Sequence, residues 1–142
     1  MKNSAGFTLV ELIVTIVLVG ILVGSAVPTF NRMVNETQSQ TNISNMVIIK
    51  NVFMQYYYDN HIAGNPHFPQ LPEDGLMDST YRHIELEDGR TPNMLFSGDL
   101  PLNSNKNPYI YKWENDTING FITKKIIIRD EDLDSPSYDK QV

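Results

Sequence analysis

The stretch GFTLVELIVTIVLVGILVGSAVP, residues 6–28, decides the fold, because it is a long apolar run that contains a single carboxylate. A helix over Phe7–Val27 would be about 31 Å long at roughly 1.5 Å per residue, which matches the hydrocarbon core of a bilayer. A charged side chain inside such a span costs on the order of 3 kcal/mol and is usually functional. The run therefore predicts a membrane span, and Glu11 is a candidate functional residue.

The six residues before this run, MKNSAG, form a short polar leader with one positive side chain, Lys2. A secretory signal peptide would carry a small-residue cleavage site after the apolar run. The sequence that follows, VPTFNRMVN, does not fit that pattern. We therefore expect the span to be retained, with its N-terminal side in the cytoplasm by the positive-inside rule.

The composition limits the classes of function that fit the chain. Its 142 residues hold no cysteine and carry a formal net charge of -6. An exported domain without disulfides must be held together by packing, by a bound ion or by neighbouring subunits. Nucleic-acid binders usually carry a basic patch, and the only adjacent basic pair is Lys124–Lys125, so nucleic-acid binding is not expected.

The residues after the apolar run predict that the helix continues. Neither proline nor glycine occurs between Phe30 and Asn60, and apolar side chains recur at helical spacing. These are Met46, Ile49, Phe53 and either Tyr56 or Tyr57. The pattern predicts an amphipathic half over residues 30–60, joined to the membrane-spanning half over residues 7–29 in one helix of roughly fifty residues, with Pro28 as a bend.

Residues 61–142 are predicted to form a small head. Proline and glycine mark His61–Asp78 as a loop. The predicted strands are Tyr81–Leu86, Pro108–Glu114 and Phe121–Arg129, the last two joined by NDTING with Asn119–Gly120 at the turn. The acidic tail DEDLDSPSYDKQV is predicted to be frayed. The fold class is therefore α+β, with a long N-terminal helix packed on a small antiparallel sheet.

The N-terminal residues Gly6, Phe7, Thr8, Leu9, Glu11 and Leu12, followed by the unbroken apolar run, resemble the leader of bacterial type IV pilins and type II secretion pseudopilins. The resemblance implies that a prepilin peptidase cuts between Gly6 and Phe7 and methylates the Phe7 amine. It also implies that mature subunits leave the inner membrane and pack helix to helix in a filament, where Glu11 meets the terminal amine of a neighbour. A glutamate that reaches the membrane interface is the alternative.

Three further residues of the span are candidates for helix packing or local melting. Gly20 and Gly24 form a GxxxG motif, which allows close approach of helices in lipid, although glycine is also tolerated there without a role. Pro28 leaves the carbonyl of Gly24 without its usual donor. In the family that the leader resembles, the region of Gly20 and Pro28 loses helical structure on assembly.

The head offers a second resemblance and a candidate ion site. Leu100–Pro101 and Asn107–Pro108–Tyr109 are similar to a loop of the major secretion pseudopilins, although Ser104–Asn105–Lys106 stands where the family has tryptophan and glycine. Those proteins bind calcium through carboxylates near the C-terminus, so Asp130, Asp132 and Asp134 are calcium candidates, with a solvated acidic tail as the alternative. No other cofactor is expected.

The expected function is that of a structural subunit in a type IV pilus-like or secretion pseudopilus filament. The expected partners are homologous subunits, prepilin peptidase, the inner-membrane assembly platform and, before assembly, the lipid bilayer. We expect a single span in the inner membrane and later a periplasmic or cell-surface filament. The absence of cysteine, and so of a closing disulfide, favours a pseudopilin or a minor pilin. The alternative is a monomeric, membrane-anchored exported protein whose head binds a ligand or partner.

Other candidate sites have simpler explanations. No nucleophile elbow, phosphate loop or metalloprotease helix occurs, so no enzymatic activity is expected. The histidines are interpreted as surface residues, and the tyrosine run as core and interface packing, because consecutive helical residues point in different directions. The glycosylation triplets that begin at Asn35, Asn42 and Asn115 are interpreted as chance matches.

Overall fold

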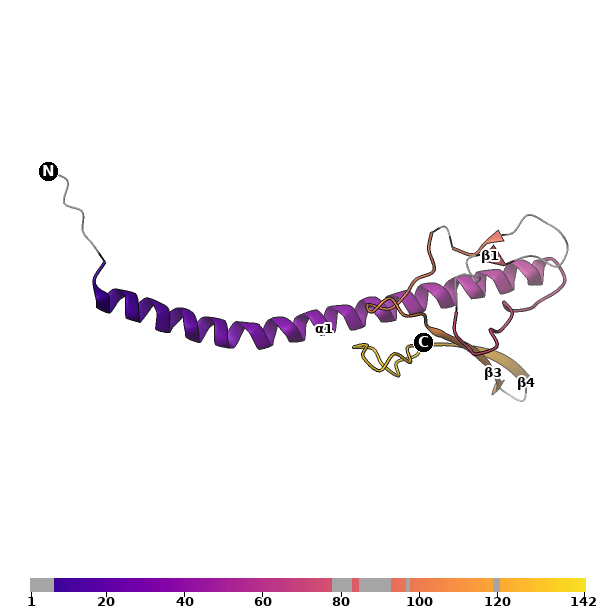
Figure 1. The fold of residues 1–142 in the computed structure, drawn as a ribbon. Helices are drawn as coiled ribbons and strands as arrows, with labels where there is room; N and C mark the ends of the chain where they lie inside the picture. Colours follow the sequence, from indigo (N-terminus) through magenta and orange to yellow (C-terminus); the bar gives the residue numbers. More distant parts are fainter. Residues whose placement is uncertain (1–6, 78–82, 85–92, 97, 119–120) are drawn as a thin grey trace. The chain divides into compact units, whose positions relative to one another are not determined.

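The structure is a computed structural model that describes residues 7–77, 83–84, 93–96, 98–118 and 121–142. The chain divides into two compact units, Met1–Glu36 and Thr37–Val142. A single helix, α1 (Leu9–Ile62), supplies residues to both units (Figure 1). It is 54 residues long and Pro28 lies inside it. The prediction of one continuous helix of roughly fifty residues is therefore confirmed.

The C-terminal half of α1 supplies one side of the core of the second unit. Met46, Ile49 and Phe53 are fully buried, as the helical spacing of apolar residues predicts. Tyr56 completes this face, whereas Tyr57 is only half-buried. The ring of Phe53 meets the ring of Tyr111 edge to face, with centroids 4.6 Å apart, an arrangement that aromatic pairs favour.

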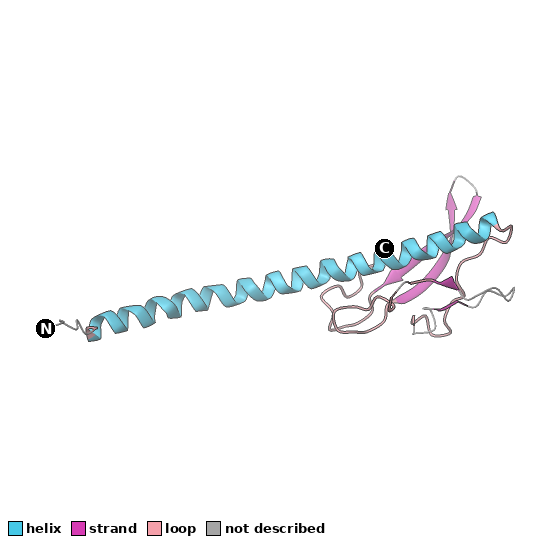
Figure 2. Cartoon of the chain, turned by 90° about the horizontal axis from the view of Figure 1, so that it is seen from above, coloured by secondary structure: helices cyan, strands magenta, loops and turns pink. Residues whose placement is uncertain are grey.

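The other side of the core is an antiparallel hairpin of β3 (Ile110–Ile118) and β4 (Phe121–Arg129), which lies beside this half of α1 (Figure 2). Residues directly opposite each other in an antiparallel pair share a face. Tyr111 therefore lies beside Ile128, and Trp113 beside Ile126. Tyr111, Ile126 and Ile128 belong to the core, and the half-buried Trp113 packs against it. The predicted α+β class is confirmed.

The remaining strands are short. The pair β1 (His83–Ile84) and β2 (Asn93–Met94) is antiparallel and forms a separate two-stranded sheet. The predicted strand Tyr81–Leu86 is described only at β1, and its other residues lie outside the described part of the chain, as does the predicted turn Asn119–Gly120. Strand β2 was not predicted.

The predicted hairpin was right in kind and partly wrong in its bounds. Phe121–Arg129 is a strand with the bounds predicted. Its partner starts at Ile110 rather than Pro108 and runs to Ile118 rather than Glu114. Asn115–Thr117, assigned to the turn by composition, lies in the strand. Only two residues separate β3 from β4. Because the connection is this short, the two strands stay paired as far as Ile118 and Phe121, and β3 is longer than predicted.

Two other segments pair with the outer edges of the hairpin. On the β3 side, the N–H of Tyr111 donates to the carbonyl of Gly75 at 2.8 Å. Gly75 has a φ of +81°, a conformation that glycine adopts without strain. On the β4 side, Val142 and Ile128 exchange backbone hydrogen bonds of 3.0 and 3.3 Å. The prediction of a frayed tail was wrong, because its last residue pairs with the sheet.

Candidate functional site

The first turn of α1 is closed by a reciprocal pair of side chains. Thr8 precedes the helix, and its backbone N–H and hydroxyl both donate to Oε2 of Glu11, at 2.9 and 2.8 Å. The N–H of Glu11 lies 3.3 Å from the hydroxyl oxygen of Thr8, which accepts from it. This arrangement is a capping box, in which two residues three apart satisfy backbone donors that the helix leaves unpaired.

The capping box gives Glu11 a role within its own chain. One oxygen of the carboxylate accepts both hydrogen bonds from Thr8. The carboxylate also lies at the N-terminal end of the helix, where the macrodipole favours a negative charge. The sequence contained the signal for this contact, since Thr8 and Glu11 stand in the T-x-x-E spacing of a capping box.

The residues that follow form an apolar helical surface with no partner in the described part of the chain. Phe7 is 85% exposed, and every residue from Phe7 to Val27 is exposed. Among the described residues, α1 is long and apolar enough to cross a membrane, and its most apolar window lies near the N-terminus with none of its residues buried. A continuous apolar surface of this size requires lipid or other helices around it.

The polar residues of this helical segment are satisfied locally. The hydroxyl of Thr15 donates to the carbonyl of Glu11 at 2.6 Å, and that of Thr29 donates to the carbonyl of Ser25 at 3.2 Å. Such bonds suit an apolar solvent, which offers no other partner. A Cβ atom added at Gly20 or Gly24 would meet nothing within 4 Å. The space beside these glycines is therefore open to a neighbouring helix.

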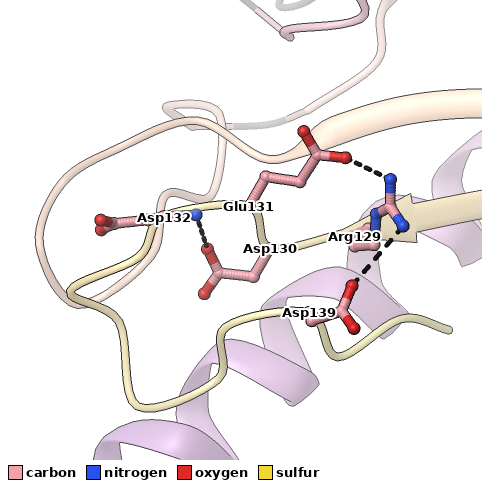
Figure 3. Close-up of polar contacts among 5 residues, drawn as sticks. All are labelled: Arg129, Asp130, Glu131, Asp132 and Asp139. Carbon is pink, nitrogen blue, oxygen red and sulfur yellow. Dashed lines mark hydrogen bonds and ion pairs between the residues drawn. The ribbon is translucent and has the colours of Figure 1, made fainter.

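The second candidate site is the loop after β4, where most of the acidic residues of the tail lie (Figure 3). Arg129 pairs with Glu131 through one terminal nitrogen and lies 3.5 Å from Asp139 through the other. The side chain of Asp130 is fully buried, and that of Asp134 is exposed. Asp132 is half-buried, so the three calcium candidates, Asp130, Asp132 and Asp134, differ in their exposure to solvent.

The carboxylate of Asp132 faces a loop of asparagines. Its Oδ2 accepts from the side-chain amides of Asn103, Asn105 and Asn107, at 2.9, 2.8 and 2.9 Å. Its Oδ1 accepts from the backbone N–H of Asp134 at 3.1 Å. Donors that point at a carboxylate favour its charged form, so they lower the pKa of Asp132 from an ordinary value of 3.8 to about 2.

Acid should therefore weaken this loop in a defined range. A carboxylate whose pKa is depressed on folding stabilises the protein above its unfolded pKa, and that stabilisation is lost as the pH falls through the folded pKa. For Asp132 the loss should run from about pH 4 to about pH 2. In acid titrations followed by Trp113 fluorescence, Asp132→Asn should remove this component. Asp134→Asn, an exposed control in the same loop, should retain it, and identical curves for both variants would contradict the assignment.

A buried asparagine on α1 joins this loop to the helix. Asn42 is fully buried, and its amide nitrogen lies 3.2, 3.1 and 2.8 Å from the hydroxyl oxygens of Ser104, Ser135 and Ser137. Its Oδ1 accepts from the N–H of Ser104 at 2.9 Å. Ser135 and Ser137 each donate in turn to Oδ2 of Asp130 at 2.6 Å. Of these residues, only Asp130 was among the predicted site residues, and it was predicted as a calcium ligand rather than as a partner of serines.

Two further contacts extend the network along the helix. Lys140 donates through Nζ to the hydroxyl of Ser39 at 2.8 Å, one turn before Asn42. The hydroxyl of Tyr109 donates to the backbone carbonyl of Asn42 at 3.3 Å. Burial raises the pKa of Tyr109 to about 12, so this hydroxyl stays a neutral donor over the physiological range. The tail is therefore attached to the helix at two successive turns.

The histidines described do not converge on a metal site. His67 lies 2.9 Å from the hydroxyl of Tyr56 through Nε2 and 2.7 Å from the carbonyl of Asn65 through Nδ1. His61 is exposed at the end of α1, and the side chain of His83 lies outside the description. Among the described residues, no group of three histidine, aspartate or glutamate side chains could hold a metal ion.

Comparison with known proteins gives two matches. Residues 1–27 match the family model of the prokaryotic N-terminal methylation motif. The chain is also 34% identical over 67 residues to the type II secretion system core protein G of Escherichia coli (strain K12). That match covers 47% of this chain and 43% of the relative, so the chain spans less than half the length of that relative. No solved structure matches the chain.

Proposed function

We propose that the chain is a structural subunit of a pilin-like filament, because residues 1–27 match the N-terminal methylation motif and part of the chain is similar to a type II secretion core protein. The observation that carries the proposal is the N-terminal helix. The apolar side chains of its segment Phe7–Val27 are exposed, and the one carboxylate of that segment, Glu11, lies in the first turn. This surface suits lipid before assembly and the helices of neighbouring subunits afterwards.

Processing of the N-terminus is the first step of the proposed function. A prepilin peptidase cuts between Gly6 and Phe7 and methylates the new amine of Phe7. The cut removes Lys2 and the other leader residues, and it places a positive charge next to the capping box of Thr8 and Glu11. The match to the N-terminal methylation motif supports this step.

Assembly then pairs Glu11 with the Phe7 amine of a neighbouring subunit. A carboxylate inside a dry helix bundle is costly unless it meets an opposite charge, so the pair favours docking in the correct axial register. The contacts with Thr8 occupy one oxygen of Glu11 in the single chain and keep the carboxylate at the helix terminus. The same contacts hold the carboxylate in a defined orientation for the amine of the neighbour.

The glycines and Pro28 have supporting roles in this proposal. Gly20 and Gly24 let the helix of a neighbour approach closely, since nothing in the described chain occupies the space beside them. Pro28 removes one helical hydrogen bond at the end of the span, so the segment from Gly20 to Pro28 is the first to lose helical structure on assembly.

The proposed location follows from the same segment. The subunit is anchored in the inner membrane by one span, with its N-terminus in the cytoplasm, and the assembly platform moves it into a periplasmic or cell-surface filament. Similarity to a type II secretion core protein favours a secretion pseudopilus over a pilus. The chain has a structural role in this proposal and performs no enzymatic reaction.

The alternative function is that of a monomeric membrane-anchored protein whose exported head binds a ligand or partner. Such an anchor requires neither the Gly6–Phe7 junction nor a carboxylate in its first turn. The N-terminus of the mature chain therefore separates the two functions.

Mass spectrometry of the N-terminus tests the proposal. In cells that also express a prepilin peptidase, the membrane-bound chain should begin at Phe7 and carry one methyl group on its amine. The matched control is Gly6→Val, which should retain Met1 while the chain still reaches the membrane. An intact leader on the unmodified chain, or a start beyond Val27, would contradict processing by this route.

A further inference from the structure

We propose that the head closes its C-terminal loop with asparagine amides in the position where calcium is expected from the resemblance to major secretion pseudopilins. The clasp consists of Asn103, Asn105 and Asn107 with the carboxylates of Asp130 and Asp132. It joins the loop before β3 to the loop after β4. The inference concerns the head alone, so its test is independent of filament assembly.

The hydrogen bonds between the asparagines and Asp132 run in a direction that opposes calcium binding. Calcium is bound by oxygen atoms, whereas an amide N–H is a donor with no lone pair to offer. Three amide nitrogens point at Oδ2 of Asp132, from 2.8 to 2.9 Å away. Three N–H donors therefore surround Oδ2 of Asp132, an oxygen that a calcium ion would otherwise use.

The orientation of Asn103 is fixed by the backbone. Its Oδ1 accepts from the N–H of Asn105 at 3.0 Å and from the N–H of Asn107 at 2.8 Å. Turning the amide over would place its NH₂ group against these two donors and its oxygen against two carboxylates. Asn103 therefore presents its nitrogen to Asp130 and Asp132, at 3.2 and 2.9 Å.

The buried carboxylate is already satisfied by neutral donors. Oδ2 of Asp130 accepts from the hydroxyls of Ser135 and Ser137, and Oδ1 accepts from Asn103 and from the N–H of Asp132. A buried carboxylate needs such donors or an ion beside it. Because four donors surround Asp130, the loop does not need a metal ion to offset its charge.

The remaining acidic side chains of the tail point elsewhere. Glu131 and Asp139 pair with the guanidinium of Arg129, and Asp132 points away from that group (Figure 3). Asp134 is exposed. A calcium site needs six to eight oxygen ligands around one point, and the described acidic residues do not supply a third carboxylate to Asp130 and Asp132.

Calcium dependence of melting tests the clasp. The full chain in detergent micelles should melt at the same temperature in about 5 mM calcium, above the Kd of typical extracellular sites, and in a chelator. A site of that kind, filled at about 5 to 50 times its Kd, would instead raise the Tm by roughly 4–19 °C. Asn107→Ala should lower the Tm equally in both buffers. The control, Asn115→Ala, removes an exposed amide from β3 and should change little.

A second variant tests the opposite outcome, because it adds carboxylates and should gain calcium binding. Asn105→Asp with Asn107→Asp replaces two donors by carboxylates that face Asp132. Repulsion should lower its Tm in chelator, and calcium should restore the Tm by at least about 5 °C. If this variant is unfolded in chelator, calcium should refold it. A calcium-stabilised wild-type chain would overturn the inference, and so would a double variant that calcium does not stabilise.

Discussion

Replacing Glu11 by glutamine or by alanine is expected to reduce filament yield more than a hundredfold while leaving the chain in the membrane. Both changes remove a charge from an apolar span, so insertion should be unchanged or improved. Assembly should fail because the Phe7 amine of the neighbour would be buried without its partner. Breaking one side of a buried ion pair costs about 3–5 kcal/mol, and every tenfold loss of affinity corresponds to about 1.4 kcal/mol.

The two variants of Glu11 separate its two roles. Glutamine keeps an acceptor for Thr8 and can still complete a capping box, whereas alanine cannot. If capping alone mattered, glutamine would assemble normally and alanine would not. The measurement is the yield of sheared filaments beside the membrane level of the same variant. Normal filaments built wholly from the alanine variant would contradict the pairing mechanism, and loss of insertion would favour a simple anchor.

The second large effect is expected at Asn42, where Asn42→Ala should lower the free energy of unfolding by about 3 kcal/mol or more. The substitution removes the acceptor for the N–H of Ser104 and the donor to the hydroxyls of Ser135 and Ser137. Each buried polar group left unpaired costs about 1–3 kcal/mol. For a head of this size, 3 kcal/mol corresponds to a fall in Tm of roughly 12–24 °C.

The matched control for Asn42 is Ser44→Ala, an exposed position on the same helix. It should leave the Tm within a few degrees of wild type, because surface substitutions usually change stability by no more than about 0.5 kcal/mol. The measurement is thermal unfolding of the full chain, followed by near-ultraviolet circular dichroism of its aromatic residues. A melt of Asn42→Ala that matches the control would show that the buried network does not stabilise the head.

The features that the sequence predicted are those with a local pattern. The apolar run from Phe7 to Val27 and the apolar face around Ile49 predicted one long helix, and the isoleucine-rich run Phe121–Arg129 predicted a strand with the observed bounds. In each case the signal lies within a few neighbouring residues, because helical and strand periodicities are short. Glu11 was identified for the same reason, as a lone charge in an apolar run.

The buried network could not be predicted because its partners are distant. Ser135 and Ser137 lie 93 and 95 positions from Asn42 along the chain. A partial signal existed, since Ser39 and Asn42 continue the buried face of α1 at helical spacing before Met46. Polar side chains are not counted in an apolar pattern, so they were omitted, and the serines of the tail were assigned to a frayed segment.

The loop before β3 illustrates a different limit of sequence reasoning. Lys106 has a φ of +65°, a left-handed conformation that only glycine adopts readily. The resemblance indicated that the tryptophan and glycine of the family are missing here, but it did not indicate that a lysine would adopt a left-handed conformation. Backbone hydrogen bonds between Asn103 and Asn107 and from Lys106 to Asn103 close this turn. Tertiary contacts decide such a position, and local propensity does not.

The most direct test of the central claim is whether the chain enters a filament. Cells that express it with its own assembly machinery would be sheared, and the filament fraction and the membranes analysed by mass spectrometry. The account predicts that the sheared filaments contain the chain and that it begins there with a methylated Phe7. A chain that remains entirely in the membrane fraction while filaments of other subunits are released would contradict the account.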